Sequence, residues 1–142
     1  MNQISPSSKA LDLARQVLRI EADAVLALAE RIDRAFLQAL ALILNCHGRV
    51  IVSGMGKSGH VGRKIASTLS STGTPAYFVH PAEASHGDLG MITRDDVLIA
   101  ISNSGESAEL LTIVPIVKRL GAKLISMTGK AHSSLAVESD VH

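Results

Sequence analysis

Short runs of apolar residues alternate with helical patterns from Gly48 to the end of the chain. Within each run the apolar residues are continuous, which is typical of strands covered on both faces, as in a parallel sheet. The segments between the runs have apolar residues at helical spacing and would form the covering layers. The pattern therefore predicts an α/β fold with a doubly wound parallel sheet. We expect strands at 49–53, 76–79, 97–101 and 123–127, and helices at 60–71, 81–88, 108–120 and from Ser133 onward.

Two helical stretches precede the sheet. The first follows Ser5-Pro6-Ser7-Ser8, where a serine hydroxyl can accept a hydrogen bond from a free N–H group of a helix start. The second covers 31–44 and ends near Gly48. We expect the two to form a hairpin with a broad apolar stripe, which either covers the sheet domain alone or covers it with one half and meets another subunit with the other half. Residues 1–142 would then be one domain, with N-terminal helices in 1–47 and the sheet core in 48–142.

The last four residues, Ser139 to His142, have the pattern of the beginning of another strand. A doubly wound sheet that stopped there would leave one edge uncovered. We therefore expect the final strand and helix to be missing, so that the chain is a partial domain.

The composition excludes several classes of protein. There are 14 basic and 13 acidic residues, one Tyr, two Phe and no Trp, so the basic stripe and aromatic platforms that nucleic-acid binding uses are lacking. Cys46 is the only cysteine, which excludes an internal disulfide and fits a reducing compartment. Neither a signal peptide nor a membrane-spanning stretch is evident. We expect a cytoplasmic protein with no nucleic-acid and no membrane partner.

The first expected strand leads into the glycine-rich loop Gly54-Met55-Gly56-Lys57-Ser58-Gly59. Its glycine spacing matches the dinucleotide-binding fingerprint, but the next strand ends in His80, where that fingerprint needs an acidic residue for a ribose hydroxyl. A P-loop would need glycine where Ile51 stands. A tight turn with an exposed lysine stays open as an alternative. Lys57, however, lies near a helix start, where the helix dipole repels a cation, so we expect an anionic ligand beside it.

A second loop of small residues, Ser102-Asn103-Ser104-Gly105-Glu106-Ser107, follows the third expected strand. One serine would suffice to cap the next helix. Three serine hydroxyls with nearby amide groups are the donors that a phosphate needs where arginine is absent. Glu109 lies in the first turn of that helix, either as an ordinary acid at a helix start or as a group beside the ligand, and Glu106 could equally be solvated. The loop predicts a phosphate site.

Between the two loops lies the segment from His80 to Asp88, with the sequence His-Pro-Ala-Glu-Ala-Ser-His-Gly-Asp. Its two histidines and two acids would lie on the same side of the sheet as both loops. Proton transfer near neutral pH and metal binding are both open to them. The spacing of His80 and His86 is not that of a structural zinc site.

Four segments together resemble a known family: 54–60, 71–75, 78–91 and 101–107. They are similar to the arabinose 5-phosphate isomerases, which belong to the sugar isomerase (SIS) domain family, and the likeness extends from about Arg15 to His142. The Ser-x-Ser-Gly-x-Ser element alone is typical of the broad SIS family. The Gly-Met-Gly-Lys-Ser-Gly-His and His-Gly-Asp-Leu-Gly elements together are much narrower.

The resemblance implies a flavodoxin-like sheet and the interconversion of D-arabinose 5-phosphate and D-ribulose 5-phosphate through an enediol. This reaction supplies Kdo, the eight-carbon acid of lipopolysaccharide or capsule. It requires no cofactor, although family members can hold a zinc ion at the position of His80. The resemblance gives Lys57 and Glu109 catalytic relevance. It implies substrate contacts by Gly73, Thr74, His80 and His86, and phosphate binding by Ser102, Asn103, Ser104 and Ser107.

The chemistry of an aldose–ketose isomerisation fits these residue types. It needs a base, an acid and a group that stabilises oxyanion charge. Glu109 and His86 are candidates for proton transfer, with acid and base not yet distinguished. Lys57 could stabilise the oxyanion or help to open the sugar ring.

The family also has a further glutamate and a further histidine in its active site, and long members carry a pair of CBS domains, beyond the point where this chain ends. We therefore expect this chain alone to be a poor catalyst. SIS domains commonly assemble with active sites near subunit interfaces, so we expect a homo-oligomer, a tetramer for the complete enzyme. Two alternatives stay open: a non-catalytic SIS regulator that binds a sugar phosphate, which would leave Lys57 without a role, and a dinucleotide-binding oxidoreductase.

Overall fold

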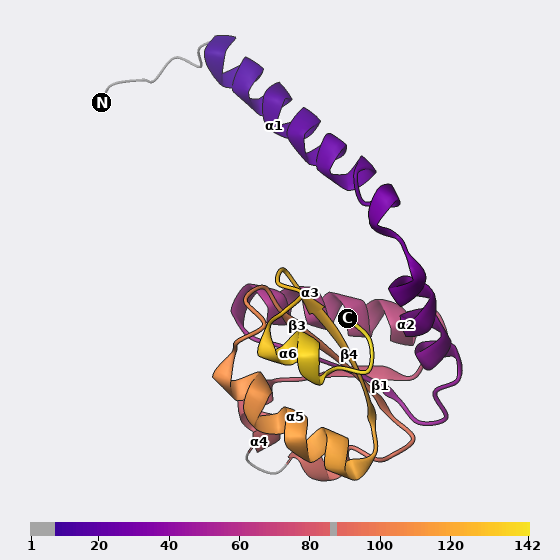
Figure 1. Ribbon diagram of the computed structural model, residues 1–142. Helices are drawn as coiled ribbons and strands as arrows, with labels where there is room; N and C mark the ends of the chain where they lie inside the picture. The colour runs from indigo at the N-terminus through magenta and orange to yellow at the C-terminus, as the bar shows by residue number, and fades with distance from the viewer. Residues whose placement is uncertain (1–7, 86–87) are drawn as a thin grey trace. The chain divides into compact units, whose positions relative to one another are not determined.

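The computed structural model describes residues 8–85 and 88–142, which form two compact units that divide after Arg34. The second unit contains a four-stranded parallel sheet among these residues, in the order β2-β1-β3-β4 (Figure 1). β1 (Val50–Gly54) pairs with β2 (Ala76–Val79) on one side and with β3 (Val97–Ser102) on the other, and β3 pairs with β4 (Lys123–Thr128). The chain thus winds outward in both directions from β1, which confirms the predicted doubly wound, flavodoxin-like sheet.

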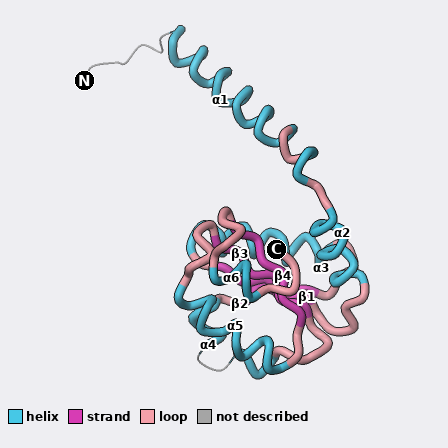
Figure 2. Tube along the Cα trace, viewed as in Figure 1, coloured by secondary structure: helices cyan, strands magenta, loops and turns pink. Residues whose placement is uncertain are grey.

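Helices cover both faces of this sheet (Figure 2). Successive residues of a strand point to opposite faces, so each strand contributes apolar side chains to both helix layers. On one face, α2 (Arg34–Leu44) and α3 (Gly56–Ser71) pack on the strands (Figure 2). The strand residues of this face are Val50, Val52, Val97, Ile99 and Ile125, each no more than 6% exposed.

The other face is covered by α4 (Pro81–Ser85), α5 (Ala108–Leu120) and α6 (Ser134–Glu138), with the short 3-10 helix η2 (Asp88–Met91) beside them. The strand residues beneath these helices are Ile51, Val79, Leu98, Ala100 and Leu124. Two fully covered faces explain why the strands are continuously apolar.

The strand bounds agree with the sequence patterns to within one residue, and α2 begins three residues later than the predicted 31–44 helix. α3 begins at Gly56, four residues before the predicted 60–71 helix, so the end of the glycine-rich loop is the first turn of the helix. Glycine is a poor helix former in a helix interior, but in the first turn the backbone N–H groups lack intrahelical acceptors whatever the residue. Of the predicted 81–88 helix, the structure describes α4 over Pro81–Ser85, and residues 86 and 87 lie outside the described residues.

The end of the chain lies beside β4. Val141 forms a parallel bridge with Ile125, and its carbonyl oxygen accepts a hydrogen bond of 2.9 Å from the Ser126 N–H. The predicted strand-like character of residues 139–142 is therefore seen as a single bridge.

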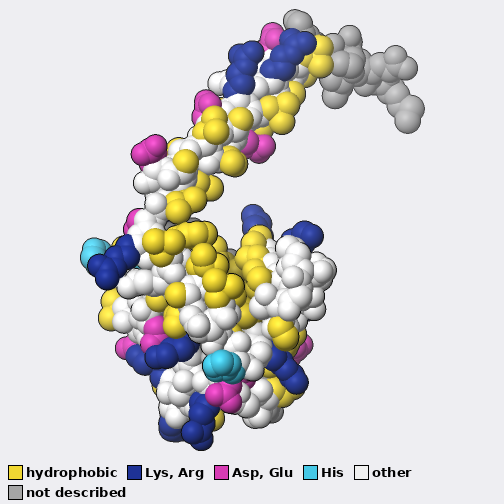
Figure 3. Space-filling view, turned by 90° about the vertical axis from the view of Figure 1, so that its right-hand side faces the viewer, with side chains coloured by type: hydrophobic (Ala, Val, Ile, Leu, Met, Phe, Trp, Pro, Cys, Tyr) yellow, Lys and Arg dark blue, Asp and Glu magenta, His cyan; other side chains and the backbone are white. Residues whose placement is uncertain are grey.

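The first unit contains α1 (Ser8–Leu26) and a short 3-10 helix, η1 (Ala29–Arg31). No helix in the described residues is both long and apolar enough to cross a membrane. Hydrophobic side chains run along α1 between charged ones (Figure 3). The packing of α1 against α2, and with it the hairpin, stays a prediction. The large apolar side chains that α1 exposes are Leu11, Leu13, Val17, Leu18, Ile20, Val25 and Leu26.

Candidate active site

The two loops predicted from the sequence lie next to each other. β1 and β3 are neighbours, and Gly54 at the end of β1 is paired with Ile101 near the end of β3. The order of the strands reverses between these two, and open α/β sheets bind their ligands at such a point, outside the carboxyl ends of the strands. The tertiary structure thus supports a single ligand site formed by both loops.

The glycines of the first loop have a structural explanation. Gly56 has a φ of +52°, which a residue with a side chain rarely adopts. A Cβ atom at Gly59 would lie 2.6 Å from the Gly54 carbonyl oxygen, so α3 can pass this close to the end of β1 only with glycine there. The spacing that imitates a dinucleotide fingerprint therefore serves the turn and the packing. It leaves the Lys57 side chain exposed on the first turn of α3.

The second loop gathers its hydroxyl groups at one point. Ser102 Oγ lies 2.8 Å from Ser107 Oγ and 3.5 Å from Ser104 Oγ. The N–H groups of Gly105 and Glu106 donate to the hydroxyls of Ser102 and Ser104, both at 3.1 Å. Ser107 is the residue before α5. Three hydroxyls ordered in this way at a helix start can donate together to the oxygens of a phosphate group.

Two further predicted residues lie at the same edge of the sheet. Glu109 is exposed in the first turn of α5, and His80 directly follows β2 and is half-buried. Lys57, His80, Glu109 and the serine loop therefore all lie at the carboxyl ends of the strands. His86 lies outside the described residues.

Gly73 and Thr74 lie at the opposite edge. They precede β2, whose first residue Ala76 pairs with Val50 at the start of β1. The strands are parallel, and each residue advances about 3.3 Å, so the two edges are roughly 16 Å apart over the length of β3. A single chain does not bring Gly73 and Thr74 to the serine loop, because α3 returns the chain to the amino ends of the strands.

The zinc ion predicted at His80 finds no support. Among residues 8–85 and 88–142, no group of three or more His, Cys, Asp or Glu side chains could hold a metal ion.

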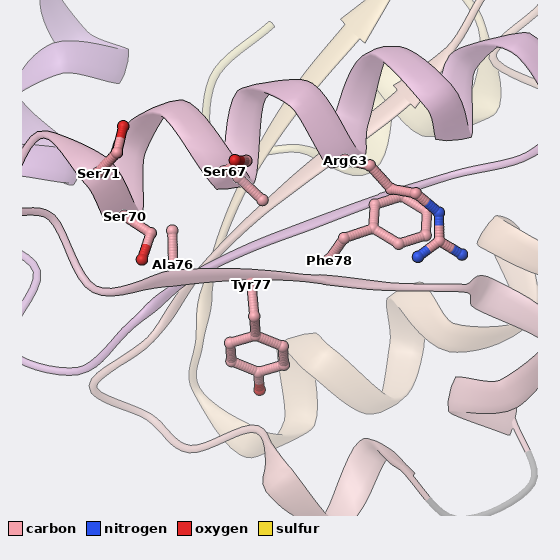
Figure 4. Close-up of a pocket in the computed structure, with 8 residues that line it drawn as sticks. Arg63, Ser67, Ser70, Ser71, Ala76, Tyr77 and Phe78 are labelled. Carbon is pink, nitrogen blue, oxygen red and sulfur yellow. The ribbon is translucent and has the colours of Figure 1, made fainter.

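Two cavities lie away from the loops. One of about 560 Å³ lies between α3 and the open edge of β2, where the Arg63 guanidinium stacks 4.2 Å from the centre of the Phe78 ring (Figure 4). Tyr77 points to the other side of the strand. A second cavity of about 310 Å³, lined by Cys46, Asp95 and Lys123 among others, lies at the amino ends of the strands. Neither is lined by Lys57 or by the serine loop.

One segment beside the candidate site, the residues after β4, is not predicted from the sequence. The Gly129 N–H donates to the Asn103 carbonyl oxygen at 3.0 Å, and the Leu135 N–H donates to the Gly105 carbonyl oxygen at 3.0 Å. The available signal was that β4, like β1 and β3, ends in a small-residue loop at the same edge. The contact of this β4 loop with the serine loop cannot be read from the sequence, because the two loops are some 26 residues apart.

Comparison with known proteins identifies the family. The family described as SIS domain matches residues 43–142. The chain belongs to the SIS domain family. This SIS domain includes both loops and all the predicted site residues.

Curated relatives of this chain are named as sugar-phosphate isomerases. The chain is 59% identical over 129 residues to the arabinose 5-phosphate isomerase KdsD of Pseudomonas aeruginosa, covering 91% of this chain and 40% of that protein. It is 49% identical over 140 residues to KdsD of Escherichia coli K12, covering 99% of this chain and 43% of that protein. The chain therefore spans less than half of the length of these curated relatives.

Solved structures agree with the fold. A structure from Escherichia coli CFT073 in complex with arabinose 5-phosphate has a TM-score of 0.89 and 43% identity, and the match covers 96% of this chain and 73% of that one. A phosphoheptose isomerase from Francisella tularensis has a TM-score of 0.73 at 21% identity, covering 92% and 81%, which is a likeness of fold alone.

Proposed function

We propose that this SIS domain belongs to an aldose–ketose isomerase that interconverts D-arabinose 5-phosphate and D-ribulose 5-phosphate. The observation that carries the proposal is the cluster of Ser102, Ser104 and Ser107 hydroxyls beside the loop that presents Lys57. The names of the relatives, and the arabinose 5-phosphate in the E. coli CFT073 structure, supply the identity of the sugar. We place the reaction in the supply of Kdo and in the cytoplasm, where the free thiol of Cys46 is stable.

The reaction transfers hydrogen between two neighbouring carbons. A base removes the proton from C2 of the open-chain aldose, and the C1 carbonyl oxygen takes up a proton to give the enediol. The O2 hydroxyl then loses its proton as C1 gains one, which yields the ketose. The oxidation of C2 balances the reduction of C1, so the reaction needs no redox cofactor.

Each group has a defined task in this proposal. The serine loop holds the phosphate, and Lys57 faces the oxygen on which negative charge develops. Glu109, in the first turn of α5, transfers a proton between the carbons, and His80 contacts the sugar. The partner in proton transfer is the predicted His86.

The phosphate site is tested by binding. Replacing both Ser104 and Ser107 with Ala is expected to raise the Kd for arabinose 5-phosphate at least tenfold, since each removes a charge-assisted hydrogen bond. Ser70→Ala, an exposed serine on α3, should leave the Kd unchanged. Calorimetry on the folded variants measures these constants. Stabilisation of the wild-type chain by NAD but not by sugar phosphates would instead favour the oxidoreductase.

We further propose a homo-oligomer, a tetramer for the complete enzyme. Gly73 and Thr74 lie at the amino ends of the strands, opposite the two loops of their own chain. If they contact substrate, the substrate is therefore bound to a second copy of the chain. The large apolar side chains exposed along α1 supply a surface that association would cover.

Sedimentation tests this proposal. The wild-type chain should sediment as an oligomer, and Leu18→Glu with Val25→Glu, which place charges on the apolar side of α1, should shift the mass to smaller species. The control Asp23→Asn alters the same helix at a polar position that points away from Leu18 and Val25. A monomeric wild-type chain at micromolar concentration would contradict the proposal for this chain.

A further inference from the structure

Glu106 lies in the serine loop, but its carboxylate is bonded to another segment. Glu106 Oε1 accepts a hydrogen bond of 2.8 Å from the backbone N–H of Ser134, the first residue of α6. This hydrogen bond lowers the pKa of Glu106, with smaller contributions from the Ser134 side chain and Lys130, while desolvation opposes them. The side chain is therefore a charged acceptor at neutral pH.

The contact of Glu106 is one of several between the serine loop and residues 128–135, which we term the bracing segment. Gly129 and Leu135 donate backbone hydrogen bonds to the carbonyl oxygens of Asn103 and Gly105. Leu135 is completely buried, which fixes the segment to the core. The serine loop is thus tied along its length to a segment that is itself anchored.

The two segments also pack closely. A Cβ atom at Gly105, whose φ is +68°, would collide with the Ser133 side chain. The Ser133 hydroxyl donates to the Lys130 carbonyl oxygen at 2.8 Å and to Thr128 Oγ1 at 3.4 Å, so this side chain is held in place. The backbone of the serine loop therefore rests against a fixed surface.

A loop that binds phosphate gains affinity when its donors are ordered before the ligand arrives, because ordering then costs little on binding. An unpaired glutamate in such a loop would instead be free to approach and repel the phosphate. The Ser134 N–H holds the Glu106 carboxylate against α6 and gives its charge a partner.

We propose that Glu106 is a positioning residue, which by bonding the Ser134 N–H holds the Ser102–Ser107 loop in the shape that binds the substrate phosphate. The inference rests on the proposed function. Glu106 itself does not touch the substrate.

Variants on both sides of the hydrogen bond test this role. Glu106→Ala removes the acceptor, and Glu106→Gln keeps an acceptor oxygen without the charge. Ser134→Pro removes the donor, and proline suits this position because Ser134 is the first residue of α6 and the preceding Ser133 is extended. Glu138→Ala is the matched control, since it removes an acid from α6 that is paired with Lys118.

We expect Glu106→Ala and Ser134→Pro each to raise the Kd for arabinose 5-phosphate and for inorganic phosphate about tenfold. Glu106→Gln should stay within about threefold of the wild type, and so should Glu138→Ala. The double variant of Glu106→Ala and Ser134→Pro should have a Kd no higher than that of either single variant, because both substitutions break the same hydrogen bond. Calorimetry measures all of these constants.

Amide hydrogen exchange separates positioning from general stability. In Glu106→Ala the N–H groups of Gly129 and Leu135 should exchange about tenfold faster, while the N–H of the buried strand residue Leu124 keeps its rate. A change that merely destabilised the whole unit would accelerate all three.

The outcomes separate this inference from the proposed function. A wild-type chain that binds neither arabinose 5-phosphate nor inorganic phosphate would overturn both. A wild-type chain that binds, with an equal Kd in Glu106→Ala, would overturn only the role of Glu106. A Glu106→Gln variant with a Kd as high as that of Glu106→Ala would also overturn the role of Glu106, because glutamine retains the acceptor oxygen.

Discussion

Replacing Lys57 with Met is expected to lower the rate of arabinose 5-phosphate isomerisation about 100-fold or more while the substrate still binds. The exposed cation on the first turn of α3 would otherwise stabilise the oxyanion of the enediolate, and the loss of one such group costs about 10²- to 10³-fold in turnover. In the proposed site the serine loop, not Lys57, holds the phosphate, so the Kd should change by less than about threefold. Incorporation of solvent deuterium at C1 of the ketose, followed by NMR, detects even slow turnover.

The matched control is Lys64→Met. Lys64 is exposed on the same helix, seven residues further along and so about 10 Å from Lys57 along the axis. It should leave the rate unchanged. Turnover by Lys57→Met at the wild-type rate would remove Lys57 from the mechanism, and together with retained sugar-phosphate binding it would favour the non-catalytic regulator.

Replacing Leu124 with Ala is expected to lower the free energy of unfolding by about 2–5 kcal/mol. Leu124 lies in β4 and is completely buried in the cluster beneath α5 and α6. The smaller side chain would leave a cavity that the surrounding strands can fill only partly. Since a domain of this size is stable by only about 5–15 kcal/mol, much of the sheet's stability would be lost. Urea unfolding followed by circular dichroism measures the change.

Leu120→Ala is the control for this substitution. Leu120 is the last residue of α5 and is 39% exposed, so the same loss of atoms should cost less than about 1 kcal/mol. Equal losses at the two positions would contradict the placement of Leu124 in the centre of the core.

The fold could be predicted well from the sequence because its signals are local. The continuous apolar runs predict buried parallel strands, and the predicted 76–79 strand and 108–120 helix have the bounds seen in the structure. The sequence pattern predicts the start of α3 four residues too late, because glycines that usually interrupt a helix here form its first turn. Lys57 is therefore a helix residue.

The candidate site was predictable only in part. The residues that follow β1, β2 and β3 could be assigned to one edge, since parallel strands point the same way. The resemblance adds Gly73 and Thr74 to the predicted site. Only the sheet register shows that they lie at the amino ends of the strands, opposite the two loops of the same chain. The sequence also left Glu106 as a residue that could be solvated, whereas the structure bonds it to Ser134.

By itself, the sequence determined the order of strands and helices, the phosphate-type loop and the family motifs, because hydrophobic period and short motifs lie within a few neighbouring residues. The tertiary structure decided which loops meet. β1 lies between β2 and β3, so loops some 48 residues apart in the sequence lie side by side, and the bracing segment reaches the serine loop because β4 lies beside β3. Such contacts depend on the pairing of strands, which no local pattern of residues encodes.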